Sequence, residues 1–269
     1  QAIDLVYFDA DSDDEGLATV GMLESDVEKI IPVPVISGKS KSFQDKMEVE
    51  ILSKNPTDKI YYAINENTNP IKYISWKSYT GPLLINETTE IKAKIDNNGN
   101  QSNIVSANFF KKPNNYSVAI KSKYNSQYTA GGIEGLIDGI HGDENWRKGE
   151  WQGYQDQDFE AVIDLQEVRD ISSISATFLQ DSRSWILMPA YVQFYTSEDN
   201  INYKIVDSPI LHSVDSKEDT TRIMPFTINQ KVSKVRYVKV FAKNFGKLPT
   251  WHQGYGGDAF IFIDEITIK

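Results

Sequence analysis

Residues 135–154 form a stretch rich in glycine and aromatic residues, Gly135-Leu-Ile-Asp-Gly-Ile-His-Gly-Asp-Glu-Asn-Trp-Arg-Lys-Gly-Glu-Trp-Gln-Gly-Tyr154. It leads into residues 158–166, Asp-Phe-Glu-Ala-Val-Ile-Asp-Leu-Gln, whose alternating apolar positions predict a β-strand. Asp138, Asp143 and Glu144 lie close together in this loop. Because glycine lets the backbone turn its carbonyls inward beside such side chains, the loop oxygens are expected to converge on one hard cation. The nearby aromatic residues offer apolar faces on which a sugar ring can lie.

The composition is that of a soluble β-protein. The chain of 269 residues contains 14 tyrosines and 5 tryptophans, and short runs of Thr, Ile and Val alternate with Asn, Gly, Asp and Pro. This length is comfortable for two domains. Because the chain has no cysteine, neither disulfides nor a thiolate metal site contribute.

The charge balance points to neutral ligands or cations. Lys and Arg number 28 against 38 Asp and Glu, which gives a net charge of -10 and disfavours nucleic acid and anionic membrane surfaces as partners. No run of about 18 apolar residues predicts membrane insertion. No signal peptide precedes Gln1, so we expect either that a signal was removed or that the chain is a fragment of a longer protein.

The first 31 residues differ from the rest and are expected to form a short α/β segment. Residues 3–8 read as a strand, and the apolar spacing after residue 16 is helical. The acidic run between them resembles the opening of an EF-hand loop. It fails that pattern, because Asp14 occupies the position of the required glycine and Val20 that of the closing glutamate. A solvated acidic turn or a helix N-terminus is therefore favoured.

Residues 32–113 predict a small antiparallel β-sandwich without catalytic spacing. The expected strands are residues 47–52, 59–64, 82–85, 89–96 and 102–110, and the charged, Pro- and Asn-containing residues 111–115 predict a linker. The motifs Ile60-Tyr-Tyr-Ala-Ile64, Tyr79-Thr-Gly-Pro-Leu83 and Glu90-Ile-Lys-Ala-Lys94 followed by Asn100-Gln-Ser-Asn103 resemble the chitobiase/β-hexosaminidase C-terminal β-sandwich. That resemblance implies an immunoglobulin-like spacer domain. Its usual Asp-Gly turn is replaced here by residues 65–70, Asn-Glu-Asn-Thr-Asn-Pro, which lengthens the hairpin.

Residues 114–269 predict longer strands at jelly-roll spacing. They are residues 161–165, 171–179, 191–197, 222–228, 235–242 and 259–268. The fold class expected for the whole chain is therefore all-β, an immunoglobulin-like sandwich followed by a jelly roll, with the short α/β segment at the N-terminus.

Motifs spread over this second half resemble the coagulation factor 5/8 type C, or discoidin-like, fold of carbohydrate-binding module family 32. Their order and spacing carry the resemblance. They are Gln127-Tyr-Thr-Ala-Gly-Gly132, Leu136-Ile-Asp-Gly139, Trp151-Gln-Gly-Tyr154, Phe178-Leu-Gln-Asp181, Ser184-Trp-Ile-Leu-Met-Pro189, Val192-Gln-Phe-Tyr-Thr-Ser-Glu-Asp199, Leu248-Pro-Thr-Trp-His-Gln-Gly254 and Phe262-Ile-Asp-Glu-Ile266. The closest resemblance is to modules appended to secreted glycoside hydrolases of Bacteroidetes, such as β-hexosaminidases. It implies a secreted, periplasmic or cell-surface location.

The resemblance also implies a structural Ca²⁺ site. Its ligands would come from the loop opened by Asp138, from carbonyls around it and from the C-terminal strand; the carried-over positions are Gly135, Asp138, Ile140, Asp143, Asp264 and Glu265. Two positions depart from the family pattern: Ile140 offers only a carbonyl in place of an asparagine, and Asp143 adds a charge where the family has threonine. Oxygen-only ligation suits Ca²⁺ rather than Zn²⁺ or Mg²⁺. The alternative is that Asp138-Gly139 is merely a turn and Glu265 a surface residue.

Sugar binding in that family uses loops at one end of the sandwich. The candidates here are Trp251, His252, Gln253, Arg183, Trp185 and Trp146 with Arg147. We expect Trp251 to be exposed, because Pro249 and Gly254 flank it in a loop without apolar periodicity. Trp185 is equally compatible with core and loop. Trp151 and Tyr154 are expected to support the fold; His212 is expected to be incidental, and His141 to face solvent.

The sequence favours a binding role over catalysis. The Asp264-Glu265 pair matches the catalytic pair of β-hexosaminidases in residue type, but neighbours on a strand are expected to point to opposite faces. A (β/α)₈ barrel needs about 250 residues and has no room here. The predicted function is a non-catalytic, glycan-binding accessory region of a glycoside hydrolase. A covalently linked catalytic domain is suspected upstream, and residues 1–31 would be its tail. The alternative is a protein- or surface-adhesion or spacer module without glycan binding.

Overall fold

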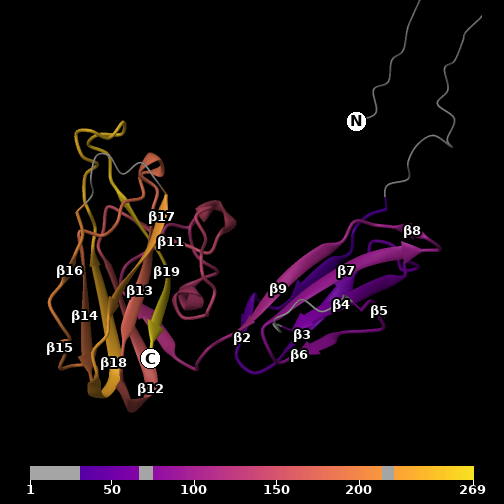
Figure 1. Cartoon of the computed structure of the whole chain (residues 1–269), viewed down its shortest axis with the longest axis horizontal. Helices are drawn as coiled ribbons and strands as arrows, with labels where there is room; N and C mark the ends of the chain where they lie inside the picture. Colours follow the sequence, from indigo (N-terminus) through magenta and orange to yellow (C-terminus); the bar gives the residue numbers. More distant parts are fainter. Residues whose placement is uncertain (1–30, 67–74, 214–220) are drawn as a thin grey trace, which may run out of the picture.

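The computed structural model describes residues 31–66, 75–213 and 221–269 (Figure 1). Within these residues the chain forms nineteen β-strands, and its helical elements are three single 3-10 turns, η2 Ile133–Leu136, η3 Trp146–Lys148 and η4 Ser182–Ser184. The predicted all-β fold class is therefore confirmed. The α/β structure expected for residues 1–31 falls, except for Ile31, outside the described residues.

Strands β1 to β9 build the first sandwich, a three-stranded sheet facing a larger one. The sheet orders are β1-β3-β6 and β2-β9-β7-β4-β5, with β8 beside β7. The strands are β1 Val35–Gly38, β2 Ser42–Phe43, β3 Met47–Leu52, β4 Ile60–Glu66, β5 Lys77–Ser78, β6 Leu83–Ile85, β7 Thr89–Asn97, β8 Asn100–Gln101 and β9 Val105–Lys111. Among the described pairs of this sandwich only β2–β9 is parallel, and the two facing sheets give an immunoglobulin-like arrangement.

Strict alternation in β3 explains how these two sheets meet. Met47, Val49 and Ile51 are buried, whereas Glu48 and Glu50 point to solvent. In an antiparallel sheet with one face on the core and the other in solvent, apolar and polar side chains alternate in this way along the strand. The predicted strand at residues 47–52 is confirmed residue for residue.

Strands β10 to β19 build the second sandwich. Its sheets have the orders β10-β12-β18-β14-β15, with β16 beside β14, and β11-β19-β13-β17. The strands are β10 Ser117–Ile120, β11 Gln152–Gln155, β12 Phe159–Ile171, β13 Ile174–Gln180, β14 Tyr191–Ser197, β15 Lys204–Ile205, β16 Ile210–Leu211, β17 Arg222–Ile228, β18 Val232–Lys243 and β19 Phe260–Ile268. All described pairs within these two sheets are antiparallel, which gives the predicted jelly-roll type of sandwich.

The strand predicted at residues 171–179 is in fact the end of one strand and the start of the next. Ile171 closes β12, and β13 begins only at Ile174. Between them the backbone N–H groups of Ser172 and Ser173 both donate to the carbonyl of Lys269. The β-forming residues at 171–179 do not reveal this turn, because the hydrogen bonds that hold it come from Lys269, which is distant in the sequence.

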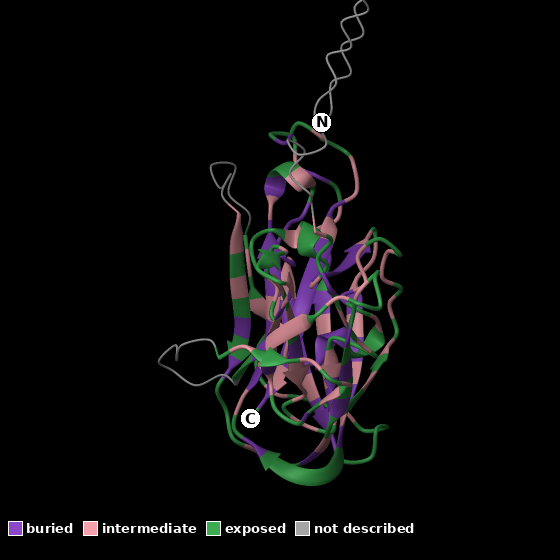
Figure 2. Cartoon of the chain, turned by 90° about the vertical axis from the view of Figure 1, so that its right-hand side faces the viewer, coloured by how far each residue is buried: buried purple, intermediate pink, exposed green. Residues whose placement is uncertain are grey.

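The inward faces of both sheets meet in one large apolar core. Phe178 of β13 and Phe226 of β17 pack edge to face, with ring centroids 5.3 Å apart. Buried positions run along the middle of the strands, and exposed ones gather at turns and loops (Figure 2). Trp151 and Tyr154 are fully buried, which confirms their expected supporting role.

Contacts between the sandwiches lie beside residues 130–150 of the second one. Lys41 forms an ion pair with Glu150 at 3.5 Å, and Lys112 pairs with Glu134. Pro113 packs so closely on Gly139 that an added Cβ there would lie 3.1 Å from its ring. A cleft of about 340 Å³ between the sandwiches reaches Asp138.

Truncating Phe178 tests the packing of the second core. Phe178→Ala should destabilise the second sandwich by about 3–5 kcal/mol, because the lost ring leaves a cavity between the sheets. Denaturant unfolding followed by tryptophan fluorescence measures the change. The matched control is Ile201→Ala, at a side chain that is 80% exposed, and it should stay within about 0.5 kcal/mol of the parent. Equal losses of unfolding free energy in the two variants would contradict the assignment of Phe178 to the core.

Candidate functional site

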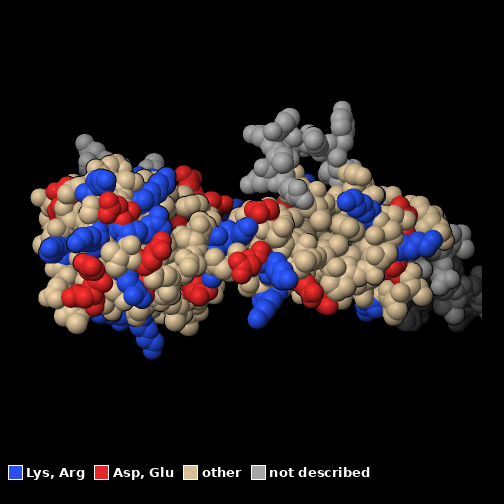
Figure 3. All heavy atoms as spheres, turned by 90° about the horizontal axis from the view of Figure 1, so that it is seen from below, with Lys and Arg blue, Asp and Glu red and all other residues tan. Residues whose placement is uncertain are grey.

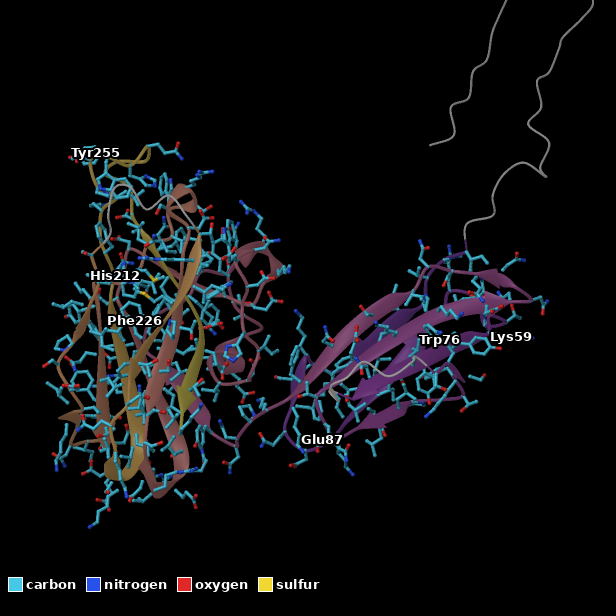
Figure 4. All side chains as sticks on the ribbon, viewed as in Figure 1. Lys59, Trp76, Glu87, His212, Phe226 and Tyr255 are labelled. Atoms are coloured by element: carbon cyan, nitrogen blue, oxygen red, sulfur yellow. The ribbon has the colours of Figure 1, made fainter. Side chains whose placement is uncertain are left out.

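Two loops meet at the end of the second sandwich that lies furthest from its C-terminus. One is residues 181–190 between β13 and β14, and the other is residues 244–259 between β18 and β19. Figure 4 shows Tyr255 at the tip of this end, with His212 and Phe226 deeper along the strands. We call this pair of loops the loop cluster. Most of the side chains predicted to contact a ligand lie on it.

Hydrogen bonds of His252 connect the two loops. Its Nδ1 accepts a hydrogen bond from the backbone N–H of Gly254 at 2.9 Å, so the ring proton lies on Nε2 and is donated to the carbonyl of Ser182 at 2.5 Å. The side chain is buried. Because both ring nitrogens are used within the protein, the structure gives His252 a positioning role in place of the predicted contact with a ligand.

Trp185 is held in a fixed orientation by a turn of glycines. Its backbone is left-handed, with φ of 67°, directly after the single turn η4. Its indole lies so close to Gly254 and Gly257 that a Cβ at either position would come within 2.8 Å of the ring. Even so, the residue is 37% exposed. The glycines therefore fix the ring while part of it stays open to solvent.

Trp251 and Tyr255 are the other aromatic residues that the loop cluster exposes. Trp251 is 39% exposed, as predicted, and Tyr255 is 66% exposed. The predicted candidates Gln253 and Arg183 are exposed beside them. Tyr255 was not among the predicted residues. Its place between Gly254 and Gly256 was a usable signal, because glycines favour turns and connecting segments run over the surface.

Trp146 supports the loop cluster and is only partly exposed. Its indole N–H donates to Asp181 at 3.0 Å, and its ring packs edge-on against Tyr128 and Phe262. The guanidinium of Arg147 lies 4.1 Å from the ring centroid and covers one face. This geometry favours a supporting role for Trp146 over the predicted contact with a ligand. Asp181, which sequence reasoning missed, joins this residue to the loop that carries Trp185.

A second group of predicted residues meets where the C-terminal strand passes the loop of residues 135–142. Phe178 and Ala176 of β13 lie opposite Ile263 and Ile266 of β19. Strand β19 therefore advances three residues while β13 advances two. This β-bulge falls at Asp264 and Glu265. A bulge breaks the alternation of side chains, and both carboxylates consequently contact the same loop.

The contacts of this pair contradict the expected opposite orientation of neighbouring strand residues. Glu265 accepts hydrogen bonds from the backbone N–H of Gly139 at 3.2 and 3.3 Å, and Asp264 accepts one from Gly142 at 2.8 Å. His141 is exposed, as expected, with Nδ1 3.7 Å from the Asp264 carboxylate. This carboxylate raises the pKa of His141.

Asp138 and Glu265 form the electrostatic centre of this region. Both are buried, at 7% and 4% exposure. Burial, followed by the charge of Asp138, raises the pKa of Glu265 to about 8, and burial raises the pKa of Asp138. The nearby cationic groups that favour ionisation are Lys112 for Asp138 and the imidazole of His141 for Glu265. Two desolvated carboxylates so weakly compensated are suited to a cation.

The remaining residues predicted as metal ligands are placed less favourably for binding a cation. The carboxylate of Asp143 points to solvent, where it pairs with Lys148, and its carbonyl accepts the indole N–H of Trp151. The backbone N–H of Ile140 donates to Asp138, and Gly135 is buried against the carbonyl of Ala130. Among the described residues, no group of three or more His, Asp or Glu side chains is arranged to hold a metal ion. Further ligands would have to be carbonyl oxygens.

Comparison with known proteins gives one family model and a set of solved structures. The model described as Fn3 associated matches residues 49–109, within the first sandwich. No curated protein matches the chain.

Three of the similar solved structures are two family 32 modules and the C-terminal domain of a chitobiase. The family 32 module of Clostridium perfringens NanJ, in complex with galactose, is 16% identical, with 57% of this chain and 92% of that chain covered and a TM-score of 0.36. The module CpGH89CBM32-5 from the same organism, in complex with GalNAc-β-1,3-galactose, is 18% identical, with coverages of 57% and 94% and a TM-score of 0.37. The C-terminal domain of a chitobiase from Bacteroides fragilis is 18% identical, with coverages of 57% and 92% and a TM-score of 0.33.

The raised pKa of Glu265 predicts an unusual pH dependence in metal-free buffer. Between its ordinary value of 4.5 and about 8, the folded chain keeps a proton that the unfolded chain has released, so stability should fall as pH rises. The slope is at most about 1.4 kcal/mol per pH unit for one group. Urea unfolding at several pH values measures it. Glu265→Gln should flatten the profile, and an unchanged slope in that variant would contradict the assignment.

Proposed function

We propose that the chain is a non-catalytic, carbohydrate-binding accessory region of a secreted or cell-surface glycoside hydrolase, and that the loop cluster is its glycan site. The observation that carries this proposal is the arrangement of Trp185, whose ring is fixed on Gly254 and Gly257 and still partly open. A sugar presents an apolar C–H face that packs on such a ring. Because the ring is already ordered, binding costs little side-chain entropy.

The chemistry around Trp185 suits a neutral sugar. Trp251 and Tyr255 extend the aromatic surface, and Gln253 and Arg183 place polar groups at its margin that can hydrogen-bond to hydroxyls. The net charge of -10 disfavours polyanionic ligands. Figure 3 views the second sandwich from the end opposite to the loop cluster, where acidic and basic side chains are interspersed. In the described part of the chain, no helix has the length and apolarity to cross a membrane.

The burial of Asp264 and Glu265 supports a binding role over catalysis by this pair. The two residues are only 0% and 4% exposed, beneath the backbone of the loop 139–142. A glycosidase needs its two carboxylates on either side of an accessible glycosidic bond. Burial keeps a glycosidic bond away from this pair, although the two side chains do not point apart as expected. In this proposal the chemistry belongs to a linked catalytic domain of the β-hexosaminidase type.

Removing Trp251 tests the glycan site. Trp251→Ala should weaken binding at least tenfold, about 1.4 kcal/mol, because truncating a central aromatic anchor is among the costliest changes in an interface. The measurement is a glycan-array screen of the purified chain, followed by calorimetry with the glycan selected.

The matched control for this test is Trp76→Ala. Trp76 is a partly exposed tryptophan of the first sandwich that lies beside Lys94. Its loss should leave glycan binding unchanged. Unaltered affinity in Trp251→Ala would move the site away from the loop cluster. An array without any binding would favour the alternative role as a protein-adhesion or spacer module.

We also propose that Asp138 and Glu265 hold a structural Ca²⁺. Their carboxylates fit this ion because both are buried with little compensating charge, and Ca²⁺ accepts a mixture of carboxylate and carbonyl oxygens. The carbonyls would come from the loop of residues 135–143 and from Asp264. When bound, the ion would neutralise the buried charge and so fix this loop against β19.

Calcium should therefore stabilise the chain. At a hundredfold excess over Kd, binding to the folded state alone adds about 2.7 kcal/mol, seen as a higher unfolding temperature that EDTA reverses. Asp138→Asn should abolish the calcium effect. The control Asp143→Asn, at an exposed carboxylate paired with Lys148, should retain it. A calcium response that survives in Asp138→Asn would place the ion elsewhere.

A further inference from the structure

The outer face of the six-stranded sheet in the second sandwich is unusually aromatic. We call its five rings the aromatic strip, defined as Tyr191, Tyr195, Tyr203, Tyr237 and Phe241. All five are partly exposed. The solvent face of an antiparallel sheet is ordinarily polar. Aromatic residues gathered on such a face mark a binding surface more often than scattered apolar residues do.

Strand register places four of these rings on one side of the sheet, and Lys239 lies over both Tyr195 and the fifth ring, Tyr203. Tyr195 lies opposite Lys239, Phe241 opposite Gln193, and Tyr237 opposite Ser197. The intervening residues of β14, Val192 and Phe194, are buried in the core. Directly opposite residues share a face, and diagonal neighbours are within reach of aromatic side chains. The strip therefore runs along the boundary between β14 and β18.

The rings of the strip are ordered by contacts with one another and with a lysine. Tyr191 and Phe241 have centroids 5.9 Å apart and an interplanar angle of 38°. The ammonium of Lys239 lies 4.4 Å from the ring centroids of both Tyr195 and Tyr203. Such cation–π contacts stabilise ring positions at the surface. Lys239 covers part of Tyr195 and Tyr203, as Arg147 does for Trp146, so a ligand would meet the exposed remainder of rings that are already arranged.

Apart from Lys239, whose ammonium lies over two rings, three charged pairs lie beside the strip, and they indicate the chemistry of its ligand. Arg236 binds the carboxylate of Asp164 at 3.0 Å, and Lys243 binds Asp158 at 2.9 Å. Lys121 and Glu160 form a third pair at the same face. Because neither sign is in large excess, the strip suits a neutral ligand with apolar faces and hydroxyl groups.

The strip begins where both segments of the loop cluster end. Tyr191 opens β14 directly after residues 181–190, and Lys243, its partner in the sheet, closes β18 directly before residues 244–259. The backbone N–H of Ala190 donates to the carbonyl of Lys243 at 2.9 Å. From Tyr191 to the level of Ser197, the strip follows the sheet for about 20 Å at the rise of a β-strand. It therefore begins at the base of the two loops that carry the proposed glycan site, and it is long enough for several sugar units.

We propose that the aromatic strip is a second binding surface for the same ligand, and that this ligand is an extended neutral polysaccharide chain rather than a single terminal sugar. One part of the chain lies on Trp185 and Trp251, and the following units pack on the strip. This inference rests on the proposed function of the loop cluster. It adds the class of ligand and assigns a role to residues outside the loops.

Calorimetry with oligosaccharides of increasing length tests this inference. The probes are β-1,4-linked N-acetylglucosamine oligomers and β-1,4-linked galactose oligomers, each from the disaccharide to the hexasaccharide. For one series, affinity should rise at least about tenfold from the shortest to the longest probe. Tyr195→Ala should remove this gain and leave disaccharide binding unchanged. Tyr195→Phe, which keeps the ring, should retain most of the gain.

Trp251→Ala separates this inference from the proposal on which it rests. It should weaken binding of short and long probes alike, because it removes the shared anchor. If short probes bind through Trp251 but affinity does not grow with length, or grows equally in Tyr195→Ala, the inference is overturned while the glycan site stands. If neither series binds at any length, both fail for these ligands. Unfolding temperatures within about 2 °C of the parent, less than the shift expected for 1 kcal/mol, confirm that the variants are folded.

Discussion

Strand β19 is the constraint on which the second sandwich depends. It lies between β11 and β13, so its residues must pair on both sides while their side chains fill the core. The loop bearing Trp251 leads directly into it, and its bulge at Asp264 and Glu265 turns two carboxylates toward the loop of residues 135–142. The position of this one strand therefore fixes one loop of the proposed glycan site and one side of the proposed calcium site.

Much of the fold could be predicted from local sequence, because burial and alternation are properties of neighbouring residues. The strand at residues 47–52 and the exposure of Trp251 followed from such patterns. The inward orientation of His252 did not, since it depends on a carbonyl 70 residues away in the chain. The bulge in β19 is equally invisible, because it appears only in the register with β13. Of the predicted metal ligands, Asp264 and Glu265 contact the loop that carries Asp138, whereas the carboxylate of Asp143 points to solvent. Their binding of Ca²⁺ remains a proposal.

The proposed site depends on order established before a ligand arrives. Hydrogen bonds of His252 join the two loops, and Gly254 and Gly257 leave just enough room for the ring of Trp185. A larger residue at either glycine would move the ring that the ligand is proposed to meet. Shallow sites of this kind bind weakly on their own. An adjoining aromatic strip, or a tether to an enzyme, raises the effective affinity without changing the site.

The most direct test of the account is a titration followed by NMR of the tryptophan indole N–H groups. The chain has 5 tryptophans, and two of them, Trp146 and Trp151, donate their indole N–H to protein oxygens. With a glycan that binds, the account predicts that the signals of Trp185 and Trp251 shift in proportion to occupancy while those of Trp151 and Trp76 stay in place. Binding that leaves Trp185 and Trp251 unchanged would contradict the assignment of the loop cluster as the glycan site.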